Sequence, residues 1–190
     1  MIPTASVRTF LEMRNLADLR RAPLPDPSVR VEQVAGCPAS FWRYLYTEVG
    51  RAYHWIDRLP WTDDEIRSYL AEPEVSLWLL TVGGAPAGYF ELKRDRVGGT
   101  EIAYFGLLPE FTGRGLGGYL LTVAVERAWA AGTERVWLHT NTLDHPAALP
   151  NYLKRGFQAF HSEVYTPGPA PAGGWTSGNV LRVGAYNPGE

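Results

Sequence analysis

The chain has 190 residues, of which 45% are hydrophobic and 20% charged, with a formal net charge of -2 at pH 7. These values predict a single globular fold with a proper core, and they argue against non-specific nucleic-acid binding, which needs a basic face. Cys37 is the only cysteine, so neither an internal disulfide nor a thiolate metal cluster is expected.

The sequence shows no apolar run of membrane-spanning length and no signal segment after Met1. With a single cysteine, this favours a cytoplasmic protein with no membrane partner and no nucleic-acid partner. The oligomeric state is open, with a homodimer as one alternative.

Residues 1–28 are predicted to form an N-terminal helical extension. The apolar residues within 4–20 recur at roughly helical spacing, and the proline-rich stretch 23–27 ends the pattern. The residues that carry this pattern are Phe10, Leu11, Met13, Leu16 and Leu19.

Residues 29–34 alternate like a strand, and helices are predicted at 39–51 and 62–71. Thr62 and Glu65 have the spacing of a capping box at the start of the second helix. An antiparallel meander follows, with three short-looped strands predicted at 75–82, 87–93 and 100–108.

The last part of the predicted domain combines helices and strands. A helix at 115–131 ends at Gly132, and a second helix at 146–155 ends at Gly156. Strands are predicted at 135–140 and 157–165. Strands 100–108 and 135–140 flank the first of these helices, so they should be parallel neighbours in one βαβ unit. The expected fold class is therefore α/β (α+β) with a mixed sheet over 29–165, followed by a Pro/Gly-rich tail at 166–190.

The segment 113–118 (GRGLGG) places four glycines directly before the predicted helix. Bare backbone N–H groups at a helix N-terminus attract anions, and a pyrophosphate is a frequent guest. The pattern formally matches a dinucleotide fingerprint, but only one βαβ unit fits in the chain, which argues against a nucleotide-dependent oxidoreductase.

The order of elements resembles the GCN5-related N-acetyltransferase (GNAT) superfamily, and two motifs carry the resemblance. Gly115-Leu116-Gly117 matches the end of the family signature Gln/Arg-x-x-Gly-x-Gly/Ala, although Thr112 stands at its Gln/Arg position. Residues 148–157 (ALPNYLKRGF) match the later pattern Ala-x-x-x-Tyr-x-x-x-Gly-Phe. The resemblance implies a sheet that splays between strands 100–108 and 135–140 to bind acyl-CoA, with acetyl-CoA as the acyl donor.

By the same resemblance, backbone groups of one strand end hold the pantetheine arm and the glycine loop holds the pyrophosphate. Asn141 and His145 are two further candidates for holding pantetheine or a water, and His145 could equally cap a helix. The cofactor-binding residues implied are Leu107, Leu108, Thr112, Gly113, Arg114, Gly115, Leu116, Gly117, Gly118, Asn141 and His145.

Acetyl transfer to an amine needs a base for the ammonium and an acid for the leaving thiolate. By resemblance, Glu101 lies where histone-acetyltransferase-like members carry a catalytic glutamate, and Tyr152 occupies the tyrosine position near the sulfur. Glu91 or a water relay is the alternative base. Strand alternation predicts one face with Glu101, Ala103 and Phe105 and another with Ile102 and Tyr104.

By the same resemblance, the segment that joins the first two helices covers the acceptor, so the acceptor would lie under residues 51–61, where Asp57 could attract an amine. The aromatic residues of this segment, with Trp42 and Tyr46, could line a pocket or merely anchor the segment to the core. The function expected is an N-acetyltransferase acting on an amine of a small molecule, peptide or protein. The alternative is a module of the same fold that binds acyl-CoA without turnover.

Overall fold

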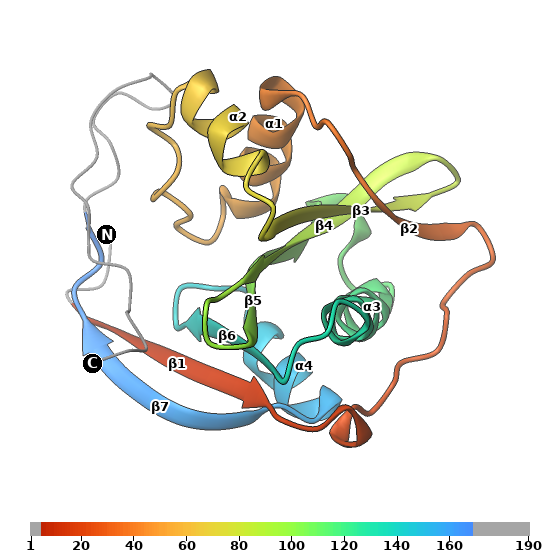
Figure 1. Ribbon diagram of the computed structural model, residues 1–190, viewed down its shortest axis with the longest axis vertical. Coiled ribbons are helices and arrows are strands. Elements are labelled where there is room, and N and C mark those ends of the chain that lie inside the picture. The colour runs from red at the N-terminus through yellow and green to blue at the C-terminus, as the bar shows by residue number, and fades with distance from the viewer. Residues whose placement is uncertain (1–4, 169–190) are drawn as a thin grey trace.

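The computed structural model describes residues 5–168, and within them seven strands form one mixed sheet with α-helices on both faces (Figure 1). The strand order is β2-β3-β4-β5-β6-β1-β7. The strands are β1 (Ser6–Met13), β2 (Val29–Gln33), β3 (Val75–Val82), β4 (Ala85–Arg94), β5 (Gly99–Leu107), β6 (Arg135–Asn141) and β7 (Gln158–Tyr165). The helices are α1 (Ala39–Gly50), α2 (Asp63–Leu70), α3 (Leu116–Ala130) and α4 (Ala148–Arg155), with short 3-10 turns η1 (Leu16–Asp18) and η2 (Pro109–Phe111).

From residue 29 onward, each predicted helix and strand is present, with boundaries shifted by at most two residues. The strands β3, β4 and β5 form the predicted antiparallel meander, and β5 pairs with β6 in parallel. The capping box of α2 is also confirmed, because Thr62 Oγ1 accepts the Glu65 N–H while the Glu65 carboxylate accepts the Thr62 N–H.

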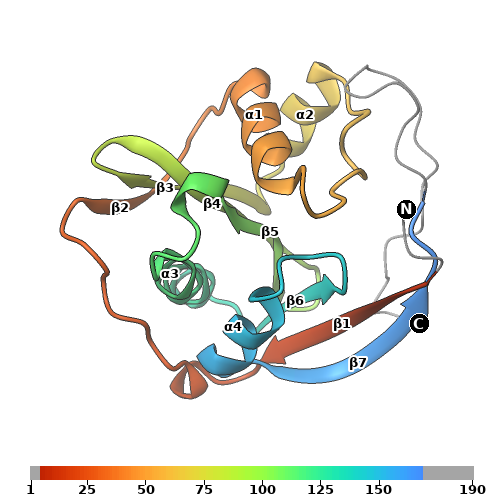
Figure 2. The same cartoon turned by 180° about the vertical axis from the view of Figure 1, so that it is seen from behind.

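The helix predicted for residues 4–20 is wrong. Residues 6–13 form β1, which lies inside the sheet between β6 and β7 and runs antiparallel to both (Figure 2). Phe10, Leu11 and Met13 are almost completely buried. A strand covered on both faces has apolar residues on consecutive positions, so it loses the period-two signal, and the nearby Leu16 and Leu19 extended the run into an apparent helical pattern.

Two apolar clusters fill the two faces of the sheet. The first packs α3 and Tyr152 of α4 against one face, and the second packs α1 and Ile66 of α2 against the other. The sheet thus separates two layers. Among the described helices, none has the length and apolar character needed to cross a membrane.

The parallel pairing of β5 with β6 is short. It joins Gly99, Thr100 and Glu101 to residues 135–137, and it ends there. β6 continues to Asn141 with β1 as its partner, while β5 continues to Leu107 with β4 as its partner. In the described part of the chain, the β6-facing edge of β5 therefore has no strand partner beyond Glu101, and the predicted splay is present.

A bulge in β5 changes which side chains share a face. Glu91 pairs with Tyr104 and the next residue of β4, Leu92, pairs with Ile102, so Ala103 is the extra residue. Because of this bulge, the alternation predicted for β5 is wrong. Glu101 shares a face with Tyr104 and with its register partner Lys93, whereas Phe105 lies on the opposite face, toward α3.

The central position of β1 makes a stability prediction. Leu11→Ala should destabilise the fold by about 2–5 kcal/mol, because the fully buried Leu11 side chain leaves a cavity inside the sheet layer. Val7→Ala on the same strand, where the side chain is 39% exposed, should change stability by less than about 1 kcal/mol. Urea unfolding of both variants measures this, and equal small losses would contradict the placement of β1.

Candidate active site

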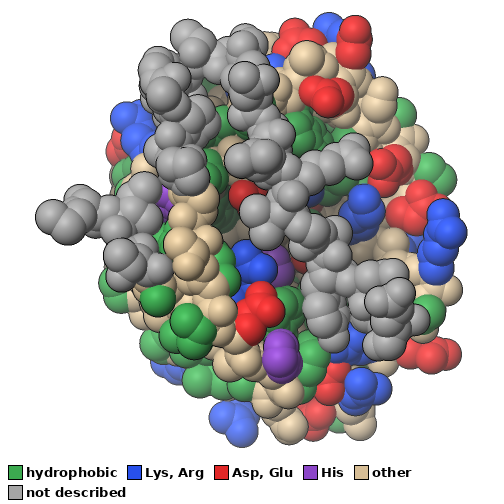
Figure 3. Space-filling model, turned by 90° about the vertical axis from the view of Figure 1, so that its left-hand side faces the viewer, with side chains coloured by type: hydrophobic (Ala, Val, Ile, Leu, Met, Phe, Trp, Pro, Cys, Tyr) green, Lys and Arg blue, Asp and Glu red, His purple; other side chains and the backbone are tan. Residues whose placement is uncertain are grey.

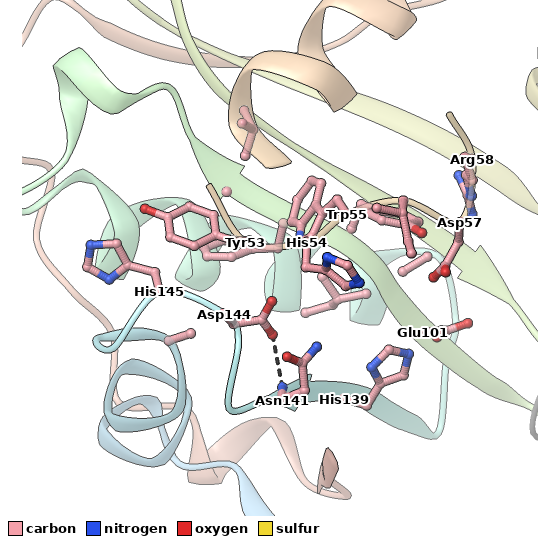
Figure 4. A pocket seen from close by; sticks show the side chains of 18 of the residues that line it. Tyr53, His54, Trp55, Asp57, Arg58, Glu101, His139, Asn141, Asp144 and His145 are labelled. Atoms are coloured by element: carbon pink, nitrogen blue, oxygen red, sulfur yellow. Dashed lines mark hydrogen bonds between the residues drawn. The ribbon is translucent and has the colours of Figure 1, made fainter. Parts of the chain in front are cut away.

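A cleft of about 1300 Å³ opens where β5 and β6 diverge. It is lined from one side by the α1–α2 segment (residues 51–62) and from the other by the glycine loop and α4, so it reaches both faces of the sheet. Figure 3 views this side of the molecule, and charged and histidine side chains gather there between apolar ones. Figure 4 shows side chains of the α1–α2 segment facing those of β5, β6 and the β6–α4 turn across the cleft.

The glycine loop forms one end of the cleft. Gly113 and Gly115 have φ values of +75° and +76°, a region that L side chains rarely adopt, and a Cβ on either would meet nothing within 4 Å. Gly115 is the N-cap of α3 and supplies no side-chain cap. The first N–H groups of α3 are thus left without a capping side chain next to open space, which is the arrangement that holds an anion.

The remaining loop glycines differ in their role. A Cβ on Gly117 would make only ordinary contacts, with Asn151 Nδ2 at 3.8 Å and Leu107 Cδ1 at 3.9 Å. A Cβ on Gly118 would lie 3.2 Å from the Ala22 side chain. Gly118 is therefore explained by close packing against the chain before β2, and only part of the loop is explained by room for a ligand.

The structure brings most of the predicted cofactor-binding residues to the cleft, but not all. Those that line it are Leu107, Thr112, Gly113, Gly115, Gly117, Gly118, Asn141 and His145. The side chains of Arg114 and Leu116 do not line it. Arg114 lies over the Phe111 ring, and Leu116 is buried in the first apolar cluster.

The expectation for Leu108 is wrong. Its N–H donates to the Ala87 carbonyl at 2.9 Å, its carbonyl accepts the Phe111 N–H at 2.9 Å, and its side chain is buried in the second apolar cluster. The sheet ends by pairing Leu108 with the chain next to β4, so its N–H is not available to pantetheine.

Tyr152 projects from α4 toward the cleft. Its ring packs edge-on against Phe105 and Phe157, at centroid distances of 6.0 and 6.2 Å. Burial raises the pKa of the Tyr152 hydroxyl well above its ordinary value, with the Asp144 carboxylate as a second cause. Because its pKa is raised, the hydroxyl keeps its proton at neutral pH. It makes no hydrogen bond within residues 5–168, so it can donate to a group in the cleft.

The β6–α4 turn is held by Asp144, a residue that the sequence analysis did not single out. Its Oδ2 accepts the Thr140 hydroxyl at 2.6 Å and the Asn141 N–H at 3.0 Å. His145 Nδ1 accepts the Ala147 N–H at 3.0 Å, but Ala147 is the N-cap of α4 and the first turn of the helix receives no side-chain cap. The His145 ring lies edge-on to Tyr53 at 5.6 Å. Figure 4 shows this ring pair, formed by one residue from each wall of the cleft.

Glu101 lines the cleft at the last pair of the β5–β6 ladder, opposite Trp137. Burial raises the pKa of the Glu101 carboxyl from 4.5 to about 7, against the opposing effect of the Arg58 and Lys93 charges. The carboxyl forms no hydrogen bond or ion pair with any residue of the described range. A carboxyl with a pKa near neutrality and an open hydrogen-bonding capacity is suited to accept a proton.

The carboxylate of Glu91, the alternative base, is instead occupied by three hydrogen-bond donors. Glu91 is completely buried, and its carboxylate accepts hydrogen bonds from Trp42 Nε1 at 2.7 Å, from Arg58 at 2.7 Å and from the Tyr69 hydroxyl at 2.9 Å. It does not line the cleft. These contacts make Glu91 an anchor for Arg58 and argue against its acting as a base.

His139 is a cleft residue that the sequence analysis missed. It lies two residues beyond Trp137 on β6, so it shares the face that carries Glu101, and its ring packs edge-on against Phe10 at 5.6 Å. The enclosing walls lower the pKa of His139 to about 4, and the Arg8 charge acts in the same direction, although the side chain stays open to the cleft. The sequence did carry a signal for His139, because this histidine lies on the strand that follows the βαβ helix. Its surroundings could not be predicted, because Phe10, which packs against it, belongs to β1, and β1 was predicted as a helix.

The aromatic residues of α1 and of the α1–α2 segment divide between the two alternatives left open by the sequence, core packing and pocket lining. Trp42 and Tyr46 are fully buried and stack on one another at 5.3 Å, so they belong to the core. Trp55 packs onto Tyr46 and also lines the cleft, as do His54 and Trp61. Asp57 lines the cleft as well and is exposed.

The sequence of residues 41–157 matches the family model described as "Acetyltransferase (GNAT) family". This match covers more than half of the chain, and the protein therefore belongs to the GNAT family. Among curated proteins, none matches the sequence.

Solved structures share the fold at low identity. A GCN5-related N-acetyltransferase from Kribbella flavida is 22% identical with a TM-score of 0.62, over 86% of this chain and 59% of its own. A second, from Sphaerobacter thermophilus, is 17% identical with a TM-score of 0.65, over 88% of this chain and 54% of its own. An aminoglycoside acetyltransferase from an uncultured soil metagenomic sample is 14% identical with a TM-score of 0.57, over 70% of this chain and 90% of its own. The chain thus spans little more than half the length of the first two.

The raised pKa of Glu101 makes a prediction about stability. The folded state binds this proton more tightly than the unfolded state, so the stabilisation is complete below the unfolded pKa of 4.5 and is lost as the pH rises through about 7. Glu101→Gln cannot ionise, and relative to wild type it should gain about 1–3 kcal/mol between about pH 5 and about pH 8. Urea unfolding across this range measures the gain. Glu134→Gln, at an exposed carboxylate before β6, is the control, and parallel pH dependence of Glu101→Gln and wild type would contradict the burial of a charge.

Proposed function

We propose that the protein is an acyl-CoA-dependent N-acetyltransferase that binds acetyl-CoA in the β5–β6 cleft and transfers the acetyl group directly to an amine. Membership of the GNAT family supports acyl-CoA chemistry in general. The observation that carries the proposal is the pairing of an uncapped, glycine-lined helix start with an unpartnered strand edge on the same cleft.

The residues present fit coenzyme A at both places. Open space surrounds Gly113 and Gly115, where backbone N–H groups of the loop and of α3 would hold the pyrophosphate. The free edge of β5 near Leu107 offers main-chain groups to the pantetheine amides, as an added strand would use them. Thr112 lacks the long side chain with N–H donors that Gln and Arg share at this position of the family signature, and its hydroxyl already donates to the Pro109 carbonyl at 2.9 Å.

The two candidate catalytic groups face the cleft with complementary properties. With a pKa of about 7, a large fraction of Glu101 is ionised at neutral pH, and it would take the proton that the acceptor ammonium must lose. Tyr152, whose pKa is raised, stays protonated and would donate to the sulfur of the leaving thiolate. The thioester supplies the activated acetyl group, and Cys37, which is buried in the second apolar cluster and does not line the cleft, has no part in the transfer. The presence of both groups favours an enzyme over a binding module.

Coenzyme A binding is tested first, by calorimetric titration with acetyl-CoA. Gly117→Asp places a carboxylate in the first turn of α3, where it should weaken acetyl-CoA binding at least about tenfold by repelling the pyrophosphate. The same charge is favourable for the helix itself, so the melting temperature should not fall. Ala130→Asp, at the exposed other end of α3, is the charge-matched control. No binding by the wild-type protein at millimolar acetyl-CoA would refute the proposal.

Catalysis is tested by thiol release with an amine library. For an accepted amine, kcat/KM should rise with pH through about 7 as Glu101 ionises, and Glu101→Gln should lower it by about a hundredfold or more and abolish this limb. Tyr152→Phe should lower kcat while acetyl-CoA binding is retained. Tyr44→Phe, at an exposed tyrosine of α1, is its control. An unchanged pH limb in Glu101→Gln would assign the proton to a water relay instead.

A further inference from the structure

The charges that line the cleft are unbalanced toward acid. Six acidic residues line it against three basic residues, Arg8, Arg58 and Lys93. Each basic residue already has a carboxylate partner: Arg8 pairs with Glu163 at 3.0 Å, Arg58 with Glu91 at 2.7 Å and Lys93 with Glu72 at 3.1 Å. The cleft therefore offers little uncompensated positive charge to an acceptor.

Most of the acidic residues are also engaged. Asp64 pairs with Arg67, Glu65 closes the capping box of α2, Glu72 pairs with Lys93, and Asp144 holds the β6–α4 turn. Within residues 5–168, the two cleft carboxylates that make no hydrogen bond or ion pair are Asp57 and Glu101. They belong to different walls, the first to the α1–α2 segment and the second to β5.

The backbone beside Asp57 is held firmly. The neighbouring Arg58 N–H donates to the Tyr46 hydroxyl at 3.1 Å, and the Arg58 guanidinium is bound to Glu91. That guanidinium also lies over the rings of Tyr69 and Tyr104, at 4.2 and 4.3 Å from their centroids. In Figure 4, Asp57 points from this anchored segment toward the β5 wall that carries Glu101.

The cleft surface beside these two carboxylates is largely aromatic and apolar. Trp55, Ile56 and Tyr104 line it. Burial raises the pKa of the Tyr104 hydroxyl, and the Asp57 carboxylate acts in the same direction against the Arg58 charge. Such walls suit a hydrocarbon spacer with a cationic group at each end.

We infer that the acceptor is a diamine, in which one amine faces Glu101 for acetylation and the other, still protonated, binds Asp57. This inference rests on the proposed function and adds the class of acceptor. The reacting amine must give up its proton, so it cannot neutralise the negative charge of Asp57. The second amine, which keeps its proton, supplies the positive charge that pairs with Asp57. A zwitterionic amino acid fits poorly, because its carboxylate would face Asp57 and each cleft cation is already paired.

The probes are diaminobutane with one amine at each end of the molecule, and butylamine. The two compounds have the same four-carbon chain and differ only in the second amine. With acetyl-CoA as donor, we expect kcat/KM for diaminobutane to exceed that for butylamine at least about fivefold, as one solvent-accessible ion pair allows. Asp57→Asn should reduce this ratio to within about twofold. Asp64→Asn, which removes a cleft carboxylate that is paired with Arg67, should keep the wild-type ratio. Equal use of the two amines, or a ratio that survives Asp57→Asn, would overturn the inference while leaving the proposed function intact.

A binding measurement separates this inference from the proposed function. Calorimetry of the protein saturated with coenzyme A should show tighter binding of diaminobutane than of butylamine, in wild type and in Asp64→Asn but not in Asp57→Asn. If coenzyme A itself does not bind, the proposed function fails, and the same amine titrations on the free protein still test Asp57. Equal binding of the two amines, or none of diaminobutane, overturns the inference in either case.

Discussion

The pairing of β5 with β6 ends after three residues, and the candidate site depends on this. Up to Glu101 the two strands share a parallel ladder, and beyond it β6 is held by β1 while β5 is held by β4. The divergence leaves main-chain groups of β5 without a strand partner and opens a cleft that reaches both faces of the sheet. Main-chain N–H and C=O groups on such an edge can pair with a ligand that acts as an added strand.

The opening brings together groups from two layers that the sheet otherwise separates. Tyr152 reaches it from the α3 and α4 layer, where its ring packs against Phe105. Glu101 reaches it on the α1 and α2 side, because the bulge at Ala103 reverses the alternation between residues 101 and 105. A group entering from the glycine loop would therefore meet the candidate acid on one side of the opening and the candidate base on the other.

The wall of the cleft that is formed by the α1–α2 segment depends on a buried ion pair. Arg58 connects the α1–α2 segment to Glu91 in the middle of β4, and three hydrogen bonds compensate the buried carboxylate. Loss of one partner of such a pair costs about 3–5 kcal/mol, because the other charge stays buried alone. The sequence offered Glu91 as an alternative base, but its carboxylate oxygens are occupied by hydrogen-bond donors and serve a structural role instead. It fixes the segment that carries Trp55 and Asp57.

The sequence by itself determined the order of elements from residue 29, the glycine loop and the family, because these depend on local signals: periodicity, capping residues and glycines before a helix. The positions of Glu101 and Tyr152 on the cleft could be predicted from the same motifs. Only the tertiary structure decided that residues 6–13 are a central strand, since a strand buried on both faces has no period of its own. It also decided the face of Glu101, the engagement of Leu108 and Glu91, and the place of His139. Each of these follows from a bulge, a ladder or an ion pair between segments far apart in the chain, and no local pattern records them.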